Sequence, residues 1–144
     1  PSGNLLDEAL EDLLAGPVPT ANFAAEFEAW KSSGAAGEYD NYLFGKDGAY
    51  RAPIGTLRHV HLVPLRDVSA LAEWNKRWRF RSRKVSNRVL VYVTDATHGN
   101  LLIYILDEPT AHEVPKLQTP AHRALIRKFI AVGDAFIQTG AVIA

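Results

Sequence analysis

The sequence predicts an α+β domain in which helices pack on a small antiparallel sheet. Apolar residues recur at helical spacing over residues 4–15, 20–34 and 120–138. Between them, residues 88–94 (RVLVYVT) and 100–106 (NLLIYIL) are rich in β-branched and aromatic side chains. The short segment that joins these two runs makes the pattern typical of an antiparallel hairpin.

The composition supports a globular chain and excludes several classes of protein. Sixteen basic and sixteen acidic side chains balance, and 47% of the 144 residues are hydrophobic, whereas disordered chains combine high net charge with few apolar residues. The chain has no cysteine, which excludes disulfides and thiolate metal ligands. The longest apolar run, residues 101–106, is far shorter than the roughly 20 residues that span a bilayer, and the acidic N-terminal region is unlike a signal peptide. We therefore expect one cytoplasmic domain over residues 1–144, without a membrane partner.

The first part of the chain predicts two amphipathic helices. Asn4 is placed to cap a helix over residues 4–15, which Gly16 and Pro17 end. Thr20 is placed to cap a second helix, which ends near residues 32–34. The apolar stripe of this second helix consists of Phe23, Ala24, Phe27 and Trp30.

A turn or short helix is expected over residues 39–44. It leads into FGKDGAY at residues 44–50, where Gly45 and Gly48 indicate backbone angles that other residues avoid.

Residues 57–64 have the pattern of a strand. Because successive strand residues face opposite ways, His59 and His61 share one face, with their rings roughly 6 to 7 Å apart. Residues 68–81, which follow, are expected to be helical or irregular.

A long helix closes the chain. Thr119 and Pro120 form a typical N-cap and first turn, and Gly140 lies beyond the expected end near residue 138. His122 lies in register with the apolar stripe of this helix, so we expect its ring to point inward or along the edge of a cleft. By contrast, His98 at the hairpin tip and His112 in a loop are expected to be exposed.

The balanced charge conceals an asymmetry. Residues 1–47 hold nine acidic and two basic side chains, and residues 48–144 hold fourteen basic and seven acidic ones. Seven of the basic side chains lie in residues 76–88 (KRWRFRSRKVSNR), which we call the basic segment; it contains no acid. These side chains, candidates for binding RNA phosphates, are Lys76, Arg77, Arg79, Arg81, Arg83, Lys84 and Arg88. A solvated charged surface is the alternative.

The histidines are the first candidates for chemistry, because imidazole can take and give a proton near neutral pH. His59 and His61 on one strand face suit an acid and a base on either side of a phosphate, or two metal ligands; packing residues are the alternative. A zinc site with His122 or a carboxylate as third ligand lacks the HExxH motif and cysteine ligands. We therefore expect no metal and no small-molecule cofactor. The motifs GxxxxGK[ST], GxGxxG and GxSxG do not occur either.

A series of short segments, in order from residue 44 to about residue 136, resembles a known family. The segments are Phe44-Gly45-Lys46-Asp47 with Tyr50, His59-Val60-His61-Leu62, Ser82-Arg83, Leu90-Val91-Tyr92, Leu101-Leu102-Ile103 with Ile105-Leu106, and His112 and His122. They resemble the YafO family of toxins from bacterial type II toxin–antitoxin systems, within the wider RelE and ParE-like fold group. One departure is that this fold group usually begins with a strand, whereas residues 4–15 predict a helix.

The resemblance implies a ribosome-dependent endoribonuclease that cleaves mRNA without a metal and is silenced by a bound antitoxin protein. Such cleavage needs a base for the ribose 2′-hydroxyl, a cation for the phosphoryl oxygens and an acid for the leaving oxygen. We expect His59, His61, Arg83, Ser82 and His122 to form the catalytic group. Two alternatives stay open: a non-catalytic module that binds RNA or the ribosome, and a ParE-like toxin directed at a topoisomerase.

Overall fold

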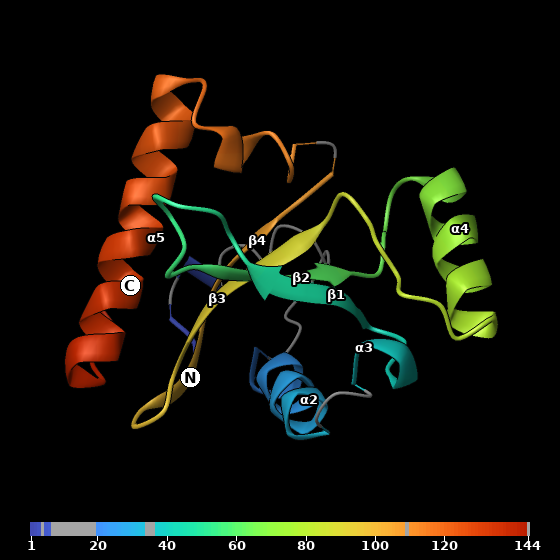
Figure 1. Cartoon of the computed structure of the whole chain (residues 1–144), viewed down its shortest axis with the longest axis horizontal. Helices are drawn as coiled ribbons and strands as arrows, with labels where there is room; N and C mark the ends of the chain where they lie inside the picture. The colour runs from blue at the N-terminus through green and yellow to red at the C-terminus, as the bar shows by residue number, and fades with distance from the viewer. Residues whose placement is uncertain (4, 7–19, 34–36, 109, 144) are drawn as a thin grey trace.

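The computed structural model describes residues 1–3, 5–6, 20–33, 37–108 and 110–143. Its centre is a four-stranded antiparallel sheet whose spatial order, β1-β2-β3-β4, follows the sequence (Figure 1). The strands are β1 (Phe44–Ala49), β2 (Arg58–Leu62), β3 (Val89–Asp95) and β4 (Gly99–Leu106). With helices packed on this sheet, the predicted α+β class is confirmed.

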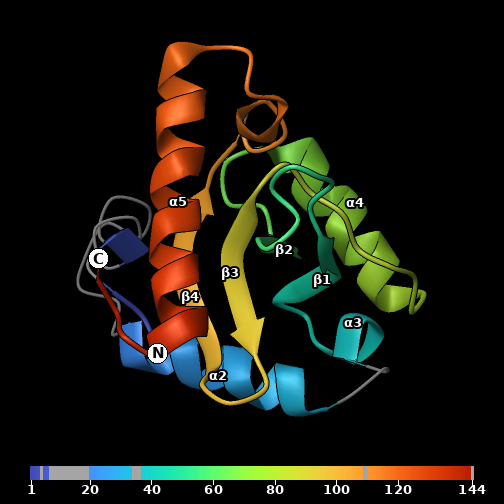
Figure 2. The same cartoon turned by 60° about the vertical axis from the view of Figure 1, so that its left-hand side comes forward.

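Two helices cover opposite faces of the sheet (Figures 1 and 2). The helix α2 (Thr20–Ser32) packs on a core that includes Val60 and Leu90, whereas α5 (Pro120–Thr139) packs on one that includes Val91. The remaining helices are the short α3 (Gly37–Asp40), α4 (Val68–Arg79), which stands apart from α5 beyond β1, and the 3-10 turn η2 (Val114–Lys116).

The helix α5 forms as its sequence predicts. The Thr119 side chain accepts a hydrogen bond from the backbone N–H of His122, Pro120 occupies the first turn, and Gly140 ends the helix at a φ of 76°. Phe129 and Phe136 are buried against the sheet. The expected bounds are therefore confirmed to within a residue or two.

The stripe predicted for α2 is also confirmed. Phe27 and Trp30 are buried, and Phe23 and Ala24 are partly buried against the same core. The helix predicted over residues 4–15 lies mostly outside the described residues; of that stretch, Leu5 and Leu6 are described, and both are helical.

Our expectation that the two glycines of FGKDGAY adopt backbone angles that other residues avoid is wrong. Neither Gly45 nor Gly48 has a positive φ. The reason for Gly45 is a close approach instead: a Cβ atom there would lie 2.2 Å from the carbonyl oxygen of Lys84. This approach lets Lys84 O accept a hydrogen bond from Lys46 N at 2.8 Å, so the chain after α4 covers the outer edge of β1.

The hairpin of β3 and β4 is confirmed, with its tip at residues 96–98. The expected exposure of His98 at this tip is wrong. Its side chain is 28% exposed, its Nδ1 lies 3.0 Å from Asp95 Oδ2, and its ring packs on Phe136 of α5.

Beyond the four strands, Ser2 forms a parallel bridge with Leu102 of β4, and Pro1 O accepts a hydrogen bond from Leu102 N at 2.9 Å. Within the described ranges, no helix combines the length and apolar character needed to cross a membrane.

Candidate active site

Three imidazole rings form a row on the α5 side of the sheet. His59 and His61 pair with Val91 and Val89 of β3, and these valines belong to the core under α5. The ring centroids of His59 and His61 are 5.8 Å apart, so the predicted shared face is confirmed. The third ring is that of His112, which comes from the loop after β4 and has its centroid 5.5 Å from that of His61. We call these three residues the histidine row.

The backbone of Ser86 holds two members of the histidine row. The Nδ1 atom of His61 lies 2.9 Å from the N–H nitrogen of Ser86 and 2.7 Å from its carbonyl oxygen. It can therefore accept from the first when unprotonated, or donate to the second when protonated. The same carbonyl lies 3.0 Å from His112 Nε2. Because the Ser86 hydroxyl donates to Leu62 O at 2.6 Å, this anchor is itself fixed to β2.

Lys46 on β1 and Tyr50, just beyond the end of that strand, complete the surroundings of the histidine row. The Tyr50 ring stacks on His59, with centroids 4.1 Å apart and an interplanar angle of 15°. Lys46 is exposed, and it lies close enough for its positive charge to lower the pKa of both His59 and His61.

Burial determines the protonation of the two strand histidines. Desolvation lowers the pKa of His59 to about 4, and the Asp47 carboxylate opposes this shift only in part. Desolvation also lowers the pKa of His61 to about 4, against the opposing hydrogen bond to Ser86. Both rings are therefore neutral at pH 7 and can accept a proton. Their access differs: His61 is only 5% exposed, His59 is partly buried and His112 is exposed.

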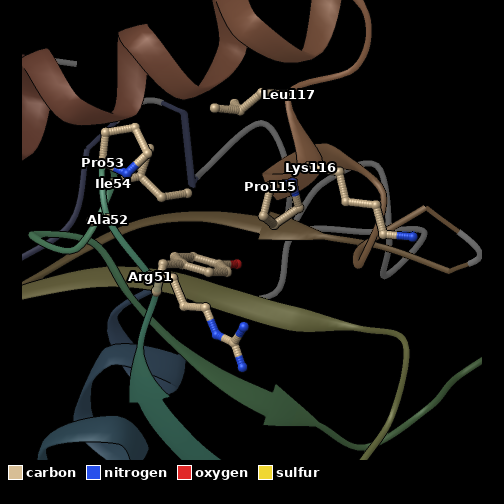
Figure 3. Close-up of a pocket in the computed structure, with 8 residues that line it drawn as sticks. Arg51, Ala52, Pro53, Ile54, Pro115, Lys116 and Leu117 are labelled. Carbon is tan, nitrogen blue, oxygen red and sulfur yellow. The ribbon is translucent and has the colours of Figure 1, made fainter.

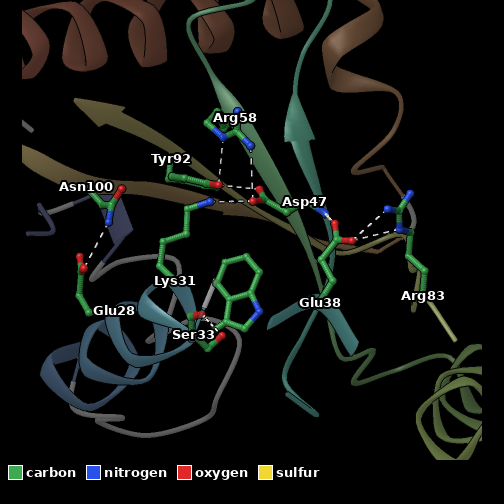
Figure 4. Close-up of polar contacts among 10 residues, drawn as sticks. Glu28, Lys31, Ser33, Glu38, Asp47, Arg58, Arg83, Tyr92 and Asn100 are labelled. Atoms are coloured by element: carbon green, nitrogen blue, oxygen red, sulfur yellow. Dashed lines mark hydrogen bonds and ion pairs between the residues drawn. The ribbon is translucent and has the colours of Figure 1, made fainter. Parts of the chain in front are cut away.

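The other expected catalytic residues make their described contacts elsewhere. Arg83 is 50% exposed and forms an ion pair at 3.1 Å with Glu38 of α3 (Figure 4). The backbone N–H of Ser82 donates to Arg77 O at the end of α4. His122 is partly buried, as expected, in the first turn of α5. The structure therefore brings together His59 and His61 and adds His112, and it does not join Arg83, Ser82 or His122 to them.

On the opposite face of the sheet, Asp47 is the centre of a second polar group (Figure 4). Its carboxylate accepts hydrogen bonds from Lys31 at 2.8 Å and from the Tyr92 hydroxyl at 2.5 Å, and lies 3.4 Å from Arg58. Since Lys31 belongs to α2, this group ties the helix to β1, β2 and β3. We interpret it as structural.

The basic segment is largely neutralised by acids from other parts of the chain. Ion pairs join Arg77 to Glu73, Arg81 to Asp40, Arg83 to Glu38 and Arg88 to Asp107.

Two members of the basic segment are buried. Lys84 is fully buried; its ammonium group lies over the rings of Trp74 and Trp78 and donates to Glu38 O at 2.8 Å. Arg88 is 4% exposed and donates to Val63 O. Burial keeps these two side chains from the surface on which a phosphate would bind, so we give them a structural role.

The expected exposure of His112 is confirmed, but sequence reasoning did not place His112, Lys46 or Tyr50 in the catalytic group. A signal for the last two was present, because Lys46 and Tyr50 are four residues apart, and residues at even spacing in an extended chain share one face, as His59 and His61 do. Had β1 been recognised as the neighbour of β2, the period of two would have placed them beside the histidines. No local pattern places His112, since its position depends on the path of the loop after β4.

Comparison with known proteins identifies the family. A family model described as Toxin YafO, type II toxin-antitoxin system, matches residues 28–138. No curated protein and no solved structure significantly matches the chain. The match runs from α2 into the last turn of α5, and it includes the whole sheet and the histidine row. Since it covers well over half of the chain, the protein belongs to the YafO family of toxins of type II toxin–antitoxin systems.

Proposed function

We propose that this toxin is an endoribonuclease that cleaves mRNA on the ribosome, and that the histidine row is its active site. The observation that carries the proposal is a row of imidazoles in which burial keeps two rings unprotonated at pH 7, beside the exposed ammonium group of Lys46. Unpaired RNA is the substrate that this chemistry fits, because it carries its own nucleophile, the 2′-hydroxyl. The ribosome requirement rests on the resemblance to the family.

The reaction needs no group beyond the chain's own side chains. A neutral imidazole takes the proton of the 2′-hydroxyl as the 2′-oxygen forms a bond to phosphorus. The bond from phosphorus to the 5′-oxygen breaks, and that oxygen takes a proton from an imidazolium. The products are a 2′,3′-cyclic phosphate and a 5′-hydroxyl end. The positive charge of Lys46 acts on both strand histidines, so we assign Lys46 the stabilisation of charge on the phosphoryl oxygens.

The exposure of the three rings suggests how they divide this work. His59 is partly exposed and His112 is exposed, so both can reach the RNA. We assign His59 the role of the base and His112 that of the acid. His61 is nearly buried between them and shares the Ser86 backbone with His112. We therefore assign His61 a positioning role.

The matched test compares histidines inside and outside the row. Purified parent protein and its His59→Gln, His112→Gln and His98→Gln variants are incubated with translating ribosomes, and new RNA 5′ ends are mapped. We expect His59→Gln and His112→Gln each to lower cleavage by about 100-fold or more, the range for loss of an acid or base. His98→Gln, at the hairpin tip, should cleave as the parent does.

Thermal unfolding of each variant separates lost chemistry from lost folding. New ends that carry 5′-phosphates, or folded row variants with full activity, would contradict the proposal. Ribosome binding without cleavage by the parent would favour the non-catalytic module. In the cell, family membership implies a cognate antitoxin as the partner that restrains the toxin.

A further inference from the structure

A cavity of about 230 Å³ lies between the loop after β1 and the 3-10 turn η2 (Figure 3). Pro53 and Ile54 form one wall, Pro115 lies opposite, and Leu117 closes the side nearest α5. The complete lining is Tyr50, Arg51, Ala52, Pro53, Ile54, Pro115, Lys116 and Leu117.

The lining combines apolar walls with positive charge. Arg51 and Lys116 are its charged members, and both are exposed. In Figure 3 their charged groups extend outward, away from the apolar walls. Lys116 also forms an ion pair with Glu113 at 3.1 Å, but that carboxylate is half-exposed and does not line the cavity. A flat apolar ligand with an attached anion fits this combination.

Tyr50 connects the cavity to the histidine row. It lines the cavity and also stacks on His59. Among the described residues, the Tyr50 hydroxyl and His59 Nδ1 are both buried without a hydrogen-bond partner. Buried polar atoms are normally paired, and Tyr50 lines the cavity, so its hydroxyl is the atom to which a ligand bound there can supply a partner.

We propose that this cavity binds one unpaired nucleobase of the RNA, that of the nucleotide next to the cleaved phosphate. The inference rests on the proposed function and adds a specificity site to it. A dry cavity of about 150 Å³ holds a benzene molecule, so the volume here has room for a base. The Tyr50 hydroxyl would bond the edge of the base, while Arg51 and Lys116 bind the flanking phosphates.

The first test measures binding without cleavage. The full chain is titrated with 2′-O-methyl trinucleotides that differ only in the central base, and with one whose central nucleotide is abasic. We expect the abasic probe to bind at least about 10-fold more weakly than the best base. Nuclear magnetic resonance should place the largest shifts on the methyl groups of Leu117 and Ile54. Equal binding of the abasic probe would overturn the proposal.

Two variants test the walls and the hydroxyl. Leu117 has a φ of 59°, a conformation that glycine adopts without strain. The Leu117→Gly variant therefore removes one wall of the cavity without straining the backbone. We expect it to weaken trinucleotide binding about 10-fold, whereas Leu65→Gly, an exposed apolar residue outside the cavity, should bind as the parent does. Tyr50→Phe keeps the ring on His59 and should reduce discrimination among the bases while leaving the abasic probe unaffected.

The outcomes separate this proposal from the proposed function. His112→Gln, which lies outside the cavity lining, should lose cleavage and keep trinucleotide affinity. If the parent cleaves RNA but Leu117→Gly keeps both affinity and base preference, the cavity assignment fails and the active site stands. If the parent binds trinucleotides with base preference but does not cleave RNA, the active-site proposal fails and the cavity assignment stands. A Leu117→Gly defect confined to binding of the antitoxin would show that the cavity serves that protein instead.

Discussion

The burial of the His59 and His61 imidazoles makes the stability of the fold depend on pH. Their pKa values are each lowered to about 4, against about 6.5 in an unfolded chain. Between these pH values the unfolded state binds more protons than the folded state, so stability falls as the pH falls. Above about pH 6.5 the penalty is absent, and below about pH 4 it is complete.

We predict that the double variant His59→Gln/His61→Gln loses less stability than the parent between pH 6.5 and pH 4. The shift of each histidine corresponds to an upper limit of about 3 kcal/mol in the free energy of unfolding. Urea titrations at a series of pH values measure this difference, in which the carboxylates common to both proteins cancel. Parallel curves for the two proteins would show that the histidines protonate alike in the folded and unfolded states.

At the scale of elements, the outer edge of the sheet depends on how closely β1 and the segment after α4 approach each other. A Cβ atom on Gly45 would lie 2.2 Å from Lys84 O, and a Cβ atom on Gly48 would meet nothing within 4 Å. We predict that Gly45→Ala lowers the free energy of unfolding by about 2 kcal/mol or more, because the backbone must shift and break the bond from Lys46 N to Lys84 O.

The matched control is Gly48→Ala, in the same strand and also without a positive φ. It should change the free energy of unfolding by less than about 1 kcal/mol. Chemical denaturation of the two variants checks both values. Equal losses would show that glycine is needed in β1 for a reason other than the contact with Lys84.

The elements that could be predicted are those whose determining residues lie close together in the sequence. The periodicity of residues 120–138 and the cap at Thr119 are local, and so α5 was predicted nearly to the residue. The strand β2 was likewise predicted, with both histidines on one face of it. The function of Gly45, the burial of Lys84 and the position of His112 each depend on a segment distant in sequence, so no local pattern revealed them.

In the whole molecule, the acidic and basic parts of the sequence lie side by side, so their charges partly neutralise each other. Acids of the N-terminal half lie against the basic segment: Glu38 pairs with Arg83, and Asp40 with Arg81. The surface left for an anionic partner is therefore smaller than the seven cations of the segment suggest. Of these seven, Lys76 and Arg79 are exposed and form no ion pair with any described residue.

This pairing predicts which cations contribute to RNA binding. Each contact with a phosphate of single-stranded RNA adds roughly 0.7 to the slope of log affinity against log salt. We expect Lys76→Ala/Arg79→Ala to lower that slope by about 1.4 if both side chains bind phosphates. Arg81→Ala/Arg83→Ala should lower it less, because each arginine must first leave a carboxylate at 3.0 or 3.1 Å.

The measurement is a salt series of RNA binding in the His112→Gln background, where cleavage is expected to be lost. An equal decrease for both double variants would mean that RNA displaces Glu38 and Asp40 from their arginines. An unchanged slope for both would mean that RNA does not reach the basic segment. In that case we would expect the positive charge for binding to come from Lys46, Arg51 and Lys116, the exposed cations beside the histidine row and the cavity.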